Sequence, residues 1–424
     1  MARRETPPIH LRSTRLLDVA AGAYVEPGDL LIEGGRITAV APSSLPEGTE
    51  TIDLGDLTLL PGLMDMEVNL FLGGPDHRSP LIPVQEDPAV RTLRAVANAK
   101  RTLRSGFTTV RNLGLFVQTG GVLLDVALAK AIDLGWVDGP RVVPAGHAIA
   151  PTGGHLDPTM FQAFAPNVLP LTVEEGLANG VDEVRKAVRY QVKYGARVIK
   201  VCASNGVMSH TGPAGAQQYS DDELAAIVDE AHRAGRKVAA HCMGDVALKA
   251  ALAAGIDCIE HGFLASDDVL DQMKAAGTFL VATTCLTDLM DLSQAGPELQ
   301  AKAADTFPRA RATTTRAIEK GLKIALGTDA PAIPHGRNAK ELLALVDRGM
   351  TPLQALQAAT LVAADLVEME DLGQLAPGFH ADVIAVAGDP LVDIAATEQV
   401  RFVMRAGEVF RNDSGGPPPR LGGS

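Results

Sequence analysis

The chain has 424 residues, of which 46% are hydrophobic and 21% are charged. Because a single hydrophobic core stops growing at about 250 to 300 residues, this length predicts either a large barrel with an accessory domain or two domains. The 51 acidic residues outnumber the 38 basic ones and give a net charge of -13, which repels nucleic acids and anionic membrane surfaces. We therefore expect a small-molecule substrate and no nucleic-acid or membrane partner.

The two ends of the sequence give simple expectations. Residues 1–8 contain two arginines but no apolar stretch long enough for a signal peptide, and no run of about 18 apolar residues occurs anywhere. Residues 413–424 are rich in glycine, proline and serine and are expected to be a disordered tail. The cysteines lie in or beside apolar runs without CxxC spacing, which is typical of buried, reduced thiols in a cytoplasmic protein; they are Cys202, Cys242, Cys258 and Cys285.

Short β-like runs occur at both ends of the chain. Runs over 29–32 and 36–40 are separated by a Gly-Gly pair, which is typical of a β-hairpin. Similar runs follow one another over 382–410. We expect residues 1–58 and 370–412 to form one small β-sandwich domain.

Residues 59–369 show a different pattern, in which short apolar runs alternate with amphipathic segments of helical periodicity. The apolar runs cover 59–66, 107–111, 141–145, 197–202, 237–241, 258–261, 279–282 and 323–327. The helical segments include 88–105, 181–195, 221–234 and 307–321. Eight such runs predict an α/β fold, a (β/α)8 TIM barrel over 59–369. A doubly wound sheet fits less well, because no glycine-rich phosphate loop follows the first run.

Polar residues stand at the carboxyl ends of these apolar runs. Because the strands of such a barrel present their carboxyl ends at one rim, we expect these side chains to lie together. They are Glu67, Asn69, Arg111, Asn112, His147, Lys200, His241, His261 and Asp329. Imidazole and carboxylate groups suit a borderline cation such as zinc, so the rim has the residue types of a metal site.

Each of these residues also has a purely structural explanation. An ammonium in the apolar strand around Lys200 needs a partner or a modification, since burial removes its solvation, and an ion pair would satisfy it. His241 and His261 are also explained as hydrogen-bonded core histidines. Asp329 is also explained as the cap of a following helix.

Motifs spread over nearly the whole chain resemble the metal-dependent amidohydrolase superfamily. They are Pro61-Gly62-Leu63-Met64-Asp65, Lys200, His241, Glu260-His261-Gly262, Gly327-Thr328-Asp329 and Ala381-Asp382-Val383-Ile384. Within the superfamily, the sequence is most similar to the branch of imidazolonepropionase-like proteins and Xaa-Pro dipeptidases. This narrower resemblance is carried by Thr108-Thr109-Val110-Arg111, Thr152-Gly153-Gly154-His155, Gly195-Ala196-Arg197-Val198-Ile199-Lys200 and Ala231-His232-Arg233-Ala234-Gly235.

The resemblance implies a (β/α)8 barrel with a flanking β-sandwich, and hydrolysis of an amide-like bond by a metal-activated water. It implies that Lys200 is carboxylated and bridges two metals, and that His241 and His261 bind one of them. It also implies that Asp329 binds the other metal and moves the proton. Zinc is the expected metal, at one or two ions per chain, with manganese or cobalt as alternatives. Superfamily members are often oligomers, which implies a homo-oligomer here.

The sequence departs from the family pattern at the end of the first run. The superfamily usually has His-x-His at this place, whereas this chain has Glu67-Val68-Asn69. It also has Asn112 where this branch often has aspartate. The chain is similar in this respect to the phenylurea hydrolases and molinate hydrolase, which place an asparagine in the motif. Here, however, the asparagine is at the second position and the first is acidic.

This departure leaves three outcomes open. Glu67 is a metal ligand in the first, which gives a more anionic site. In the second, one metal remains, bound by carboxylated Lys200, His241 and His261. In the third, activity has been lost. His77, shortly after the first run, is a further potential nitrogen ligand.

Substrate contacts are expected from loops and strand ends. By resemblance, His155 is expected to bind a carbonyl or carboxylate, and Tyr219 is another candidate. Arg111 at the second strand end is a third. The long segment 203–220 contains His210 and has the length of a substrate lid.

These observations predict a metal-dependent hydrolase of a carbon–nitrogen bond in an amide-like small molecule. The bond belongs to an N-acyl amino acid, an Xaa-Pro dipeptide, a carbamate or a urea. The alternatives are a catalytically impaired ligand-binding barrel, and a deaminase or lactonase of the same superfamily.

Overall fold

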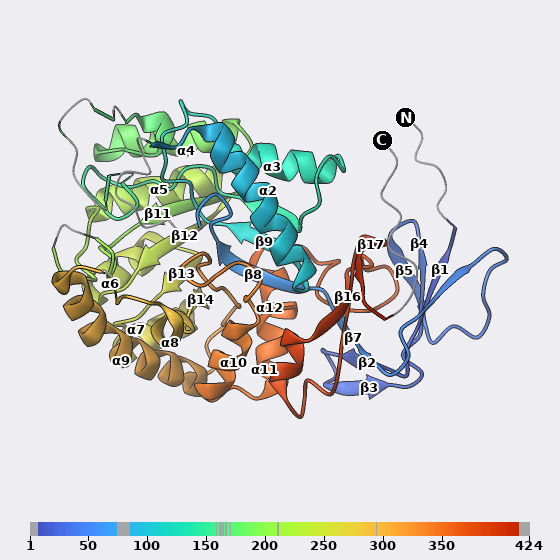
Figure 1. Ribbon diagram of the computed structural model, residues 1–424. Coiled ribbons are helices and arrows are strands. Elements are labelled where there is room, and N and C mark those ends of the chain that lie inside the picture. The colour runs from blue at the N-terminus through green and yellow to red at the C-terminus, as the bar shows by residue number, and fades with distance from the viewer. Residues whose placement is uncertain are drawn as a thin grey trace.

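The computed structural model describes residues 7–73, 85–157, 159–160, 165, 168–169, 171–209, 212–293 and 295–414. Its fold is mixed α/β and of the TIM-barrel type. A β-rich part that contains β1 and β17 lies beside a larger part in which helices surround the inner strands (Figure 1). No helix of the described residues is long and apolar enough to cross a bilayer.

The β-rich part is built from two sheets. The first has the order β5-β4-β1-β6, with β1 Ile9–Arg12, β4 Leu30–Glu33, β5 Arg36–Val40 and β6 Glu50–Asp53. The second has the order β17-β16-β15-β7-β2-β3, with β2 Arg15–Asp18, β3 Ala23–Val25, β7 Thr58–Pro61, β15 Val383–Val386, β16 Val400–Arg405 and β17 Glu408–Asn412. The predicted hairpin is present, because β4 and β5 pair in antiparallel fashion.

Strands from both ends of the chain share the second sheet. Leu60 of β7 is opposite Ile384 of β15 in an antiparallel pair. One buried apolar cluster takes residues from both sheets, among them Leu11, Ile32 and Phe402. Both sheets therefore contribute side chains to one buried apolar cluster.

The inner strands form two parallel sheets. One contains β8 Leu63–Val68, β9 Phe107–Asn112 and β10 Arg141–Pro144, and the other contains β11 Val198–Cys202, β12 Lys237–Cys242, β13 Cys258–His261 and β14 Phe279–Val281. Nearly every residue of these strands is buried. Strands that are covered on both faces have continuous apolar sequences, and this is why the apolar runs predicted these strands.

Two of the predicted runs differ from the structure. The run 59–66 is divided at Gly62 into β7 and β8, which belong to different sheets. The backbone passes close to Thr108 there, since a Cβ atom at Gly62 would lie 2.2 Å from Thr108 Oγ1. The run 323–327 does not form a regular strand. Its ladder is interrupted because the Leu326 amide donates to the carbonyl of Ala358 rather than to a neighbouring strand.

The segment 323–330 nevertheless connects the two inner sheets. Ile324 forms a parallel bridge with Leu280 of β14, and the Met66 amide of β8 donates to the Leu326 carbonyl at 2.8 Å. On the opposite side, Ile149 bridges Val201 of β11. Backbone hydrogen bonds thus continue past the edges of both sheets.

The helices follow the strands along the chain. They are α2 Pro88–Arg104, α3 Leu124–Asp133, α4 Gly180–Lys193, α5 Asp221–Arg233, α6 Asp245–Ala254, α7 Asp267–Ala276, α8 Leu286–Leu289, α9 Pro297–Lys320, α10 Lys340–Asp347, α11 Pro352–Ala358 and α12 Leu361–Leu366. The helices predicted over 88–105, 181–195 and 221–234 are confirmed within two residues. The helix predicted from residue 307 begins at Pro297 instead, since proline is favoured in the first turn.

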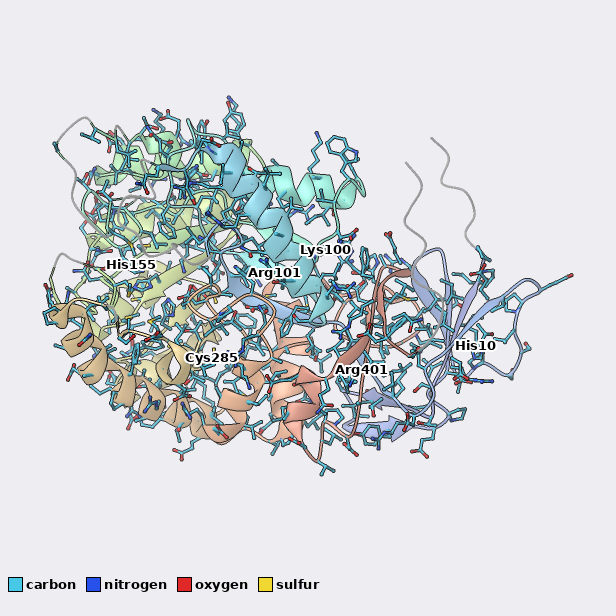
Figure 2. All side chains as sticks on the ribbon, in the orientation of Figure 1. His10, Lys100, Arg101, His155, Cys285 and Arg401 are labelled. Atoms are coloured by element: carbon cyan, nitrogen blue, oxygen red, sulfur yellow. The ribbon has the colours of Figure 1, made fainter. Side chains whose placement is uncertain are left out.

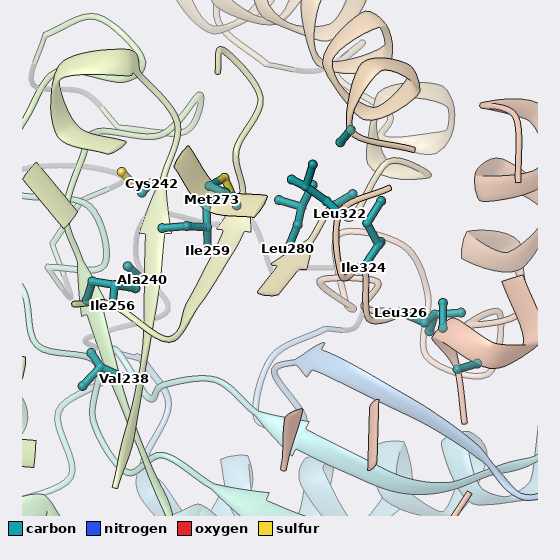
Figure 3. Packing of buried hydrophobic residues seen from close by; sticks show 14 of the residues in the cluster. Val238, Ala240, Cys242, Ile256, Ile259, Met273, Leu280, Leu322, Ile324 and Leu326 are labelled. Atoms are coloured by element: carbon teal, nitrogen blue, oxygen red, sulfur yellow. The ribbon is translucent and has the colours of Figure 1, made fainter. Parts of the chain in front are cut away.

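Alternation along the strands separates the helix-facing side chains from the inner ones. Val238, Ala240 and Cys242 of β12 belong to the large cluster that packs against the helices (Figure 3). Ala239 belongs to a separate inner cluster, and His241 is on the same face of the strand as Ala239. The pattern therefore places the imidazole on the face of β12 that points away from the large helix-facing cluster.

Candidate active site

Side chains from four strand ends or strand interiors converge inside the helix-covered part. The Lys200 Nζ atom of β11 lies 3.2 Å from Glu67 Oε1 of β8. The Nε2 atom of His261, at the end of β13, lies 3.7 Å from the same oxygen. The ring of His261 is 4.8 Å from that of His241, between centroids. The structure thus brings together residues that are far apart in the sequence.

Irregular backbone aims two of these side chains. The register of β8 against β9 shifts between Asp65 and Val68, and such a bulge re-aims the side chain within it, here Glu67. His261 has φ of 72°, a left-handed conformation that non-glycine residues rarely adopt. Since strict alternation would give His261 the same outward face as Ile259, this conformation is what allows its ring to reach Glu67.

Glu67 and Lys200 form a buried ion pair. Their side chains are 6% and 1% exposed. Burial alone would lower the pKa of Lys200, but the carboxylates of Glu67 and Glu260 raise it above its ordinary value. The second oxygen of Glu67, Oε2, is buried and has no hydrogen-bond partner among the described residues. Lys200 therefore carries a positive charge in this arrangement, and Glu67 keeps one oxygen available.

His261 presents an unprotonated nitrogen to the cluster. Its Nδ1 atom lies 2.8 Å from Thr283 Oγ1, and this hydroxyl donates its own proton to the Ala282 carbonyl at 2.8 Å. Thr283 therefore accepts from Nδ1–H, which leaves the lone pair of a neutral imidazole on Nε2. Burial, with a contribution from the Lys200 charge, lowers the pKa of His261 to about 3.

His241 is the second neutral imidazole. Its Nε2 atom is buried and has no hydrogen-bond partner among the described residues. Burial first, and then the neighbouring His155, His261 and Lys200, lower the pKa of His241 well below its ordinary value. A buried nitrogen without a partner is costly, and it is the kind of atom that a ligand or metal would satisfy.

Asp329 follows the irregular segment 323–328 and belongs to the same charge cluster. Its amide donates to the Glu67 carbonyl at 2.7 Å, and its φ is 53°. Burial and then the negative charge of Glu67 raise the pKa of Asp329 well above its ordinary value. A carboxyl group with a raised pKa holds a proton more readily than an ordinary aspartate does.

A buried carboxylate beneath the cluster fixes the backbone before Asp329. Asp65 accepts hydrogen bonds from Thr328 Oγ1 at 2.6 Å, from the Thr328 amide at 3.0 Å and from Asn338 Nδ2 at 2.7 Å. Burial raises the pKa of Asp65 to about 6, against the effect of these donors. Asp65 therefore ties β8 to the segment that carries Asp329.

His155 lies against the cluster from the loop after β10. Its ring stacks on that of His241, with centroids 3.8 Å apart and an angle of 22° between the planes. Its Nδ1 atom lies 2.9 Å from Ser209 Oγ. His155 is in the helix-rich part of the molecule, whereas His10 lies among the end strands (Figure 2). The structure thus brings this predicted substrate-binding residue to the cluster.

Other predicted residues are already engaged by the protein. Arg111 is 2% exposed and donates to Glu260 Oε1 at 2.8 Å and to the Met66 carbonyl at 2.7 Å. The Tyr219 hydroxyl donates to the Ala178 carbonyl at 2.9 Å within the large apolar cluster. Both side chains have protein partners because their polar atoms are buried and must be satisfied. Their substrate contacts stay predictions from the sequence.

Both asparagines at the altered strand ends also bond to the backbone. Asn69 donates to the Gly114 carbonyl at 2.9 Å and accepts from the Phe71 amide at 3.2 Å. Asn112 accepts from the Leu70 amide at 2.9 Å. The predicted ligand role of Asn69 is therefore not supported by its contacts. His147 Nε2 lies 2.9 Å from the side-chain hydroxyl of Thr119, and its Nδ1 atom is buried without a hydrogen-bond partner among the described residues. His77 and His210 lie outside the described residues.

Some residues that shape the site were not found by sequence reasoning. Thr283 sets the tautomer of His261, and Ser209 contacts His155. Both contacts join segments that are distant in the sequence, so no spacing rule predicts them. Glu260 belongs to one of the motifs that carry the resemblance, but its ion pair with Arg111 joins two strands that are distant in the sequence.

The donor atoms of the cluster include several that a metal ion could bind. In the described part of the chain, no three His, Cys, Asp or Glu side chains are arranged closely enough to hold a metal ion. The free nitrogens of His241 and His261 and the free oxygen of Glu67 are nevertheless ligand atoms that suit zinc. Carboxylation of Lys200 would replace its ammonium by two further oxygens. The residues therefore fit a metal when Lys200 is carboxylated.

An α/β fold of the TIM-barrel type, with imidazoles, carboxylates and a lysine at its strand ends, has the arrangement of a hydrolase site. Residues 58–410 match the Amidohydrolase family. The chain belongs to this family, and it is an enzyme that hydrolyses carbon–nitrogen bonds. The family predicted from the motifs is thus confirmed.

Several relatives are similar over most of their length. Ochratoxinase from Aspergillus niger is 36% identical over 389 residues, which are 85% of this chain and 77% of that protein. The crystal structure of a Xaa-Pro dipeptidase with methionine bound in the active site has a TM-score of 0.88 and 34% identity, over 96% of this chain and 100% of the other. A prolidase complexed with N-methylphosphonate-L-proline has a TM-score of 0.85 and 31% identity over the same shares.

Proposed function

We propose that this enzyme hydrolyses the amide bond of an N-acyl amino acid or an Xaa-Pro dipeptide. The observation that carries the proposal is the cluster of Lys200, His241 and His261, which has two free imidazole nitrogens. The carboxyl group of Asp329 interacts with the charge of Lys200 in the same cluster. The names of the relatives support this substrate class, since a dipeptidase and a prolidase complexed with a proline compound are among them. Carbamates and ureas are the next substrates to examine.

We propose that carboxylated Lys200, His241 and His261 hold one zinc ion, with manganese or cobalt as alternatives. When bound, the metal supplies a Lewis acid that acidifies a water molecule and polarises the scissile carbonyl. Asp329 accepts a proton from the attacking water and delivers it to the leaving nitrogen. The raised pKa of Asp329 suits this double role, since it must be an acceptor first and a donor afterwards.

One ion is favoured over two by the contacts at the end of β8. Asn69 uses its side-chain amide for backbone hydrogen bonds, and Glu67 is the counter-ion of Lys200. A second ion would need Glu67 and Asp329 as its protein ligands. Such a site would be rich in negative charge and would favour a harder cation.

The same proposal extends to the architecture. The segment 323–330 bonds to β14 and to β8, which supports a ring of eight strands within residues 59–369. The apolar cluster shared by the two end sheets supports a β-sandwich domain formed by residues 1–58 and 370–412. A homo-oligomer and a cytoplasmic location remain predictions from the sequence.

The proposal is tested with purified full-length protein, its metal content and a panel of substrates. We expect about one zinc ion per chain and turnover of N-acyl amino acids or Xaa-Pro dipeptides that chelation abolishes and zinc restores. Asp329→Asn leaves Lys200, His241 and His261 in place, so the variant should still bind the metal. Its kcat/KM should fall by about 1,000-fold, the scale of general acid–base catalysis. Metal-loaded protein that turns over no amide, carbamate or urea would refute the proposal.

A ligand-binding barrel without activity is the second candidate, and one observation favours it. Lys200 and Glu67 form an ion pair that satisfies both charges without a metal. A protein of this kind would contain an unmodified Lys200 and no stoichiometric metal. Mass spectrometry and 13C NMR after exposure to labelled bicarbonate distinguish the two candidates, since a carbamate on Lys200 gives its own carbon resonance.

A further inference from the structure

A tight turn in the loop after β11 holds a serine hydroxyl against His155. The Ser209 amide donates to the Gly206 carbonyl at 3.3 Å, and the Gly206 amide donates to Ser209 Oγ at 3.0 Å. These reciprocal bonds close a four-residue turn and fix the position of the hydroxyl. Ser209 is only 2% exposed, so the geometry of this hydroxyl is set by the protein and not by solvent.

The glycine of this turn makes room for two imidazoles. A Cβ atom at Gly206 would lie 2.6 Å from Cε1 of His155 and 3.0 Å from Cε1 of His241. Both distances are too short for ordinary contacts, so a side chain at this position would push the stacked rings apart. The turn therefore packs directly on the pair of rings that reaches the cluster.

The outer helix α9 holds the same turn from the other side. Lys302 Nζ donates to the Ser209 carbonyl at 2.8 Å, and its side chain is 15% exposed. Ser209 is thus bonded through its amide, its carbonyl and its hydroxyl. These contacts fix both the backbone and the side chain of Ser209.

The hydroxyl proton of Ser209 determines the protonation of His155. The oxygen already accepts from the Gly206 amide. Among the described residues, His155 Nδ1, 2.9 Å away, is the hydrogen-bond partner of Ser209 Oγ that can accept the hydroxyl proton. A buried hydroxyl proton needs an acceptor. Since a neutral imidazole carries one ring proton, donation to Nδ1 leaves that proton on Nε2.

We propose that Ser209 is a positioning residue that fixes His155 in the Nε2–H tautomer, so that this N–H donates to an oxygen atom of the substrate. The proposal rests on the proposed function, because an amide substrate with a carbonyl or carboxylate oxygen supplies the acceptor. No described residue hydrogen-bonds to Nε2, and the stack on His241 places this ring beside the metal-binding imidazole.

The tautomer is measured directly and without turnover. The full chain is labelled with 15N-histidine, and the resonances of His155 are identified by their loss in His155→Gln. We expect a pyridine-type nitrogen at Nδ1 and a pyrrole-type nitrogen at Nε2 in the wild type, and a mixture of tautomers in Ser209→Ala. A proton on Nδ1 in the wild type would overturn the proposal, whether or not a substrate has been found.

Kinetics then separate positioning from loop structure. We expect Ser209→Ala to lower kcat/KM about tenfold, the scale of one hydrogen bond, mostly through a higher KM. Ser209→Thr, which keeps the hydroxyl, should restore most of the loss, and Ser220→Ala at the end of the same loop should change little.

A double-mutant cycle completes the test. In the His155→Gln background, the amide nitrogen supplies a donor near the Nε2 position that does not depend on Ser209. We expect Ser209→Ala to have no further effect in that background, within about twofold. The same tenfold loss in both backgrounds would show that Ser209 acts on the loop and not through His155, which contradicts the proposal.

Discussion

The two sides of the strand-end cluster use their polar groups in opposite ways. On the β12 and β13 side, His241 and His261 keep ligand-type nitrogens free, and Thr283 sets the tautomer of His261. On the β8 side, the Asn69 side-chain amide donates to a backbone carbonyl, and Glu67 neutralises Lys200. One side is therefore prepared for a ligand from outside, whereas the other is largely satisfied by the protein itself.

The difference between the two sides follows from charge. A neutral residue in place of Glu67 would leave Lys200 as a buried ammonium without this counter-ion, which is costly. The inner strands instead contain two ion pairs, Lys200 with Glu67 and Arg111 with Glu260. The acidic residue at the altered motif thus stabilises the unmodified lysine, and any carboxylation of Lys200 must work against it.

One substitution on the β12 side of the cluster and one on the β8 side should give the largest difference in metal content. His241→Ala removes a nitrogen that the protein leaves free, and we expect metal content to fall to less than about a tenth of the wild-type value, together with activity. Asn69→Ala removes two backbone hydrogen bonds and should cost about 1–3 kcal/mol of stability but leave metal content unchanged. Elemental analysis and thermal denaturation of both variants decide this; equal metal loss in both would place Asn69 in the site.

A second prediction concerns the ion pair on the β8 side. Glu67→Gln removes the counter-ion of Lys200, and we expect the metal-free protein to lose about 3 kcal/mol of unfolding free energy. In metal-loaded protein with carboxylated Lys200, the same substitution should cost much less, because a repulsion between two negative groups disappears. Denaturant titrations of both forms provide the measurement. An equal loss in both forms would mean that Lys200 stays an ammonium.

A third prediction concerns the tautomer of His261. Thr283→Val removes the acceptor of Nδ1–H, and we expect zinc affinity to fall about tenfold, as for other residues that orient a metal-binding histidine. The neighbouring Thr284 is a matched control, because its buried hydroxyl has no hydrogen-bond partner among the described residues. Thr284→Val should leave the affinity unchanged. Competition with a zinc chelator measures both, and similar affinities for the two variants would exclude a role for Thr283.

The sequence predicted the strands better than the contacts of the site. The apolar runs that became β9 to β14 were visible because both faces of these strands are buried. The identity of Lys200, His241, His261 and Asp329 as one group also came from the sequence. The direction of Glu67 depends on a bulge in β8, and that of His261 on a left-handed backbone. Neither irregularity has a local sequence signal, so the sequence placed both residues at the site without predicting the backbone that aims them.

The engagement of Tyr219 and Arg111 could not be anticipated for a related reason. Their hydrogen-bond partners, Ala178 and Glu260, lie on other segments of the fold. The sequence pattern around a polar residue at a strand end is the same whether the side chain binds a substrate or hydrogen-bonds to a backbone carbonyl. Only the three-dimensional arrangement distinguishes the two uses.

The smallest effect is expected beneath the site, at Glu341 of α10. This buried carboxylate accepts from the amides of Thr284 and Cys285 at 2.9 and 2.7 Å and thereby holds the loop after β14 that carries Thr283. Burial raises the pKa of Glu341 from 4.5 to about 8. The folded state therefore binds this proton more tightly than the unfolded state, and its contribution to stability is full below pH 4.5 and is lost as the pH rises towards 8.

Glu341→Gln carries no titrating group and keeps an oxygen that accepts one of the two amide hydrogen bonds. We expect its melting temperature, relative to that of the wild type, to rise by about 2 °C between pH 5 and pH 9. Calorimetry of both proteins at the two pH values gives the difference, in which the other titrating groups cancel. A difference in melting temperature that does not change with pH would mean that Glu341 is ionised throughout this range. The loop after β14 would then be held by a charged carboxylate, like those in the ion pairs of the cluster above it.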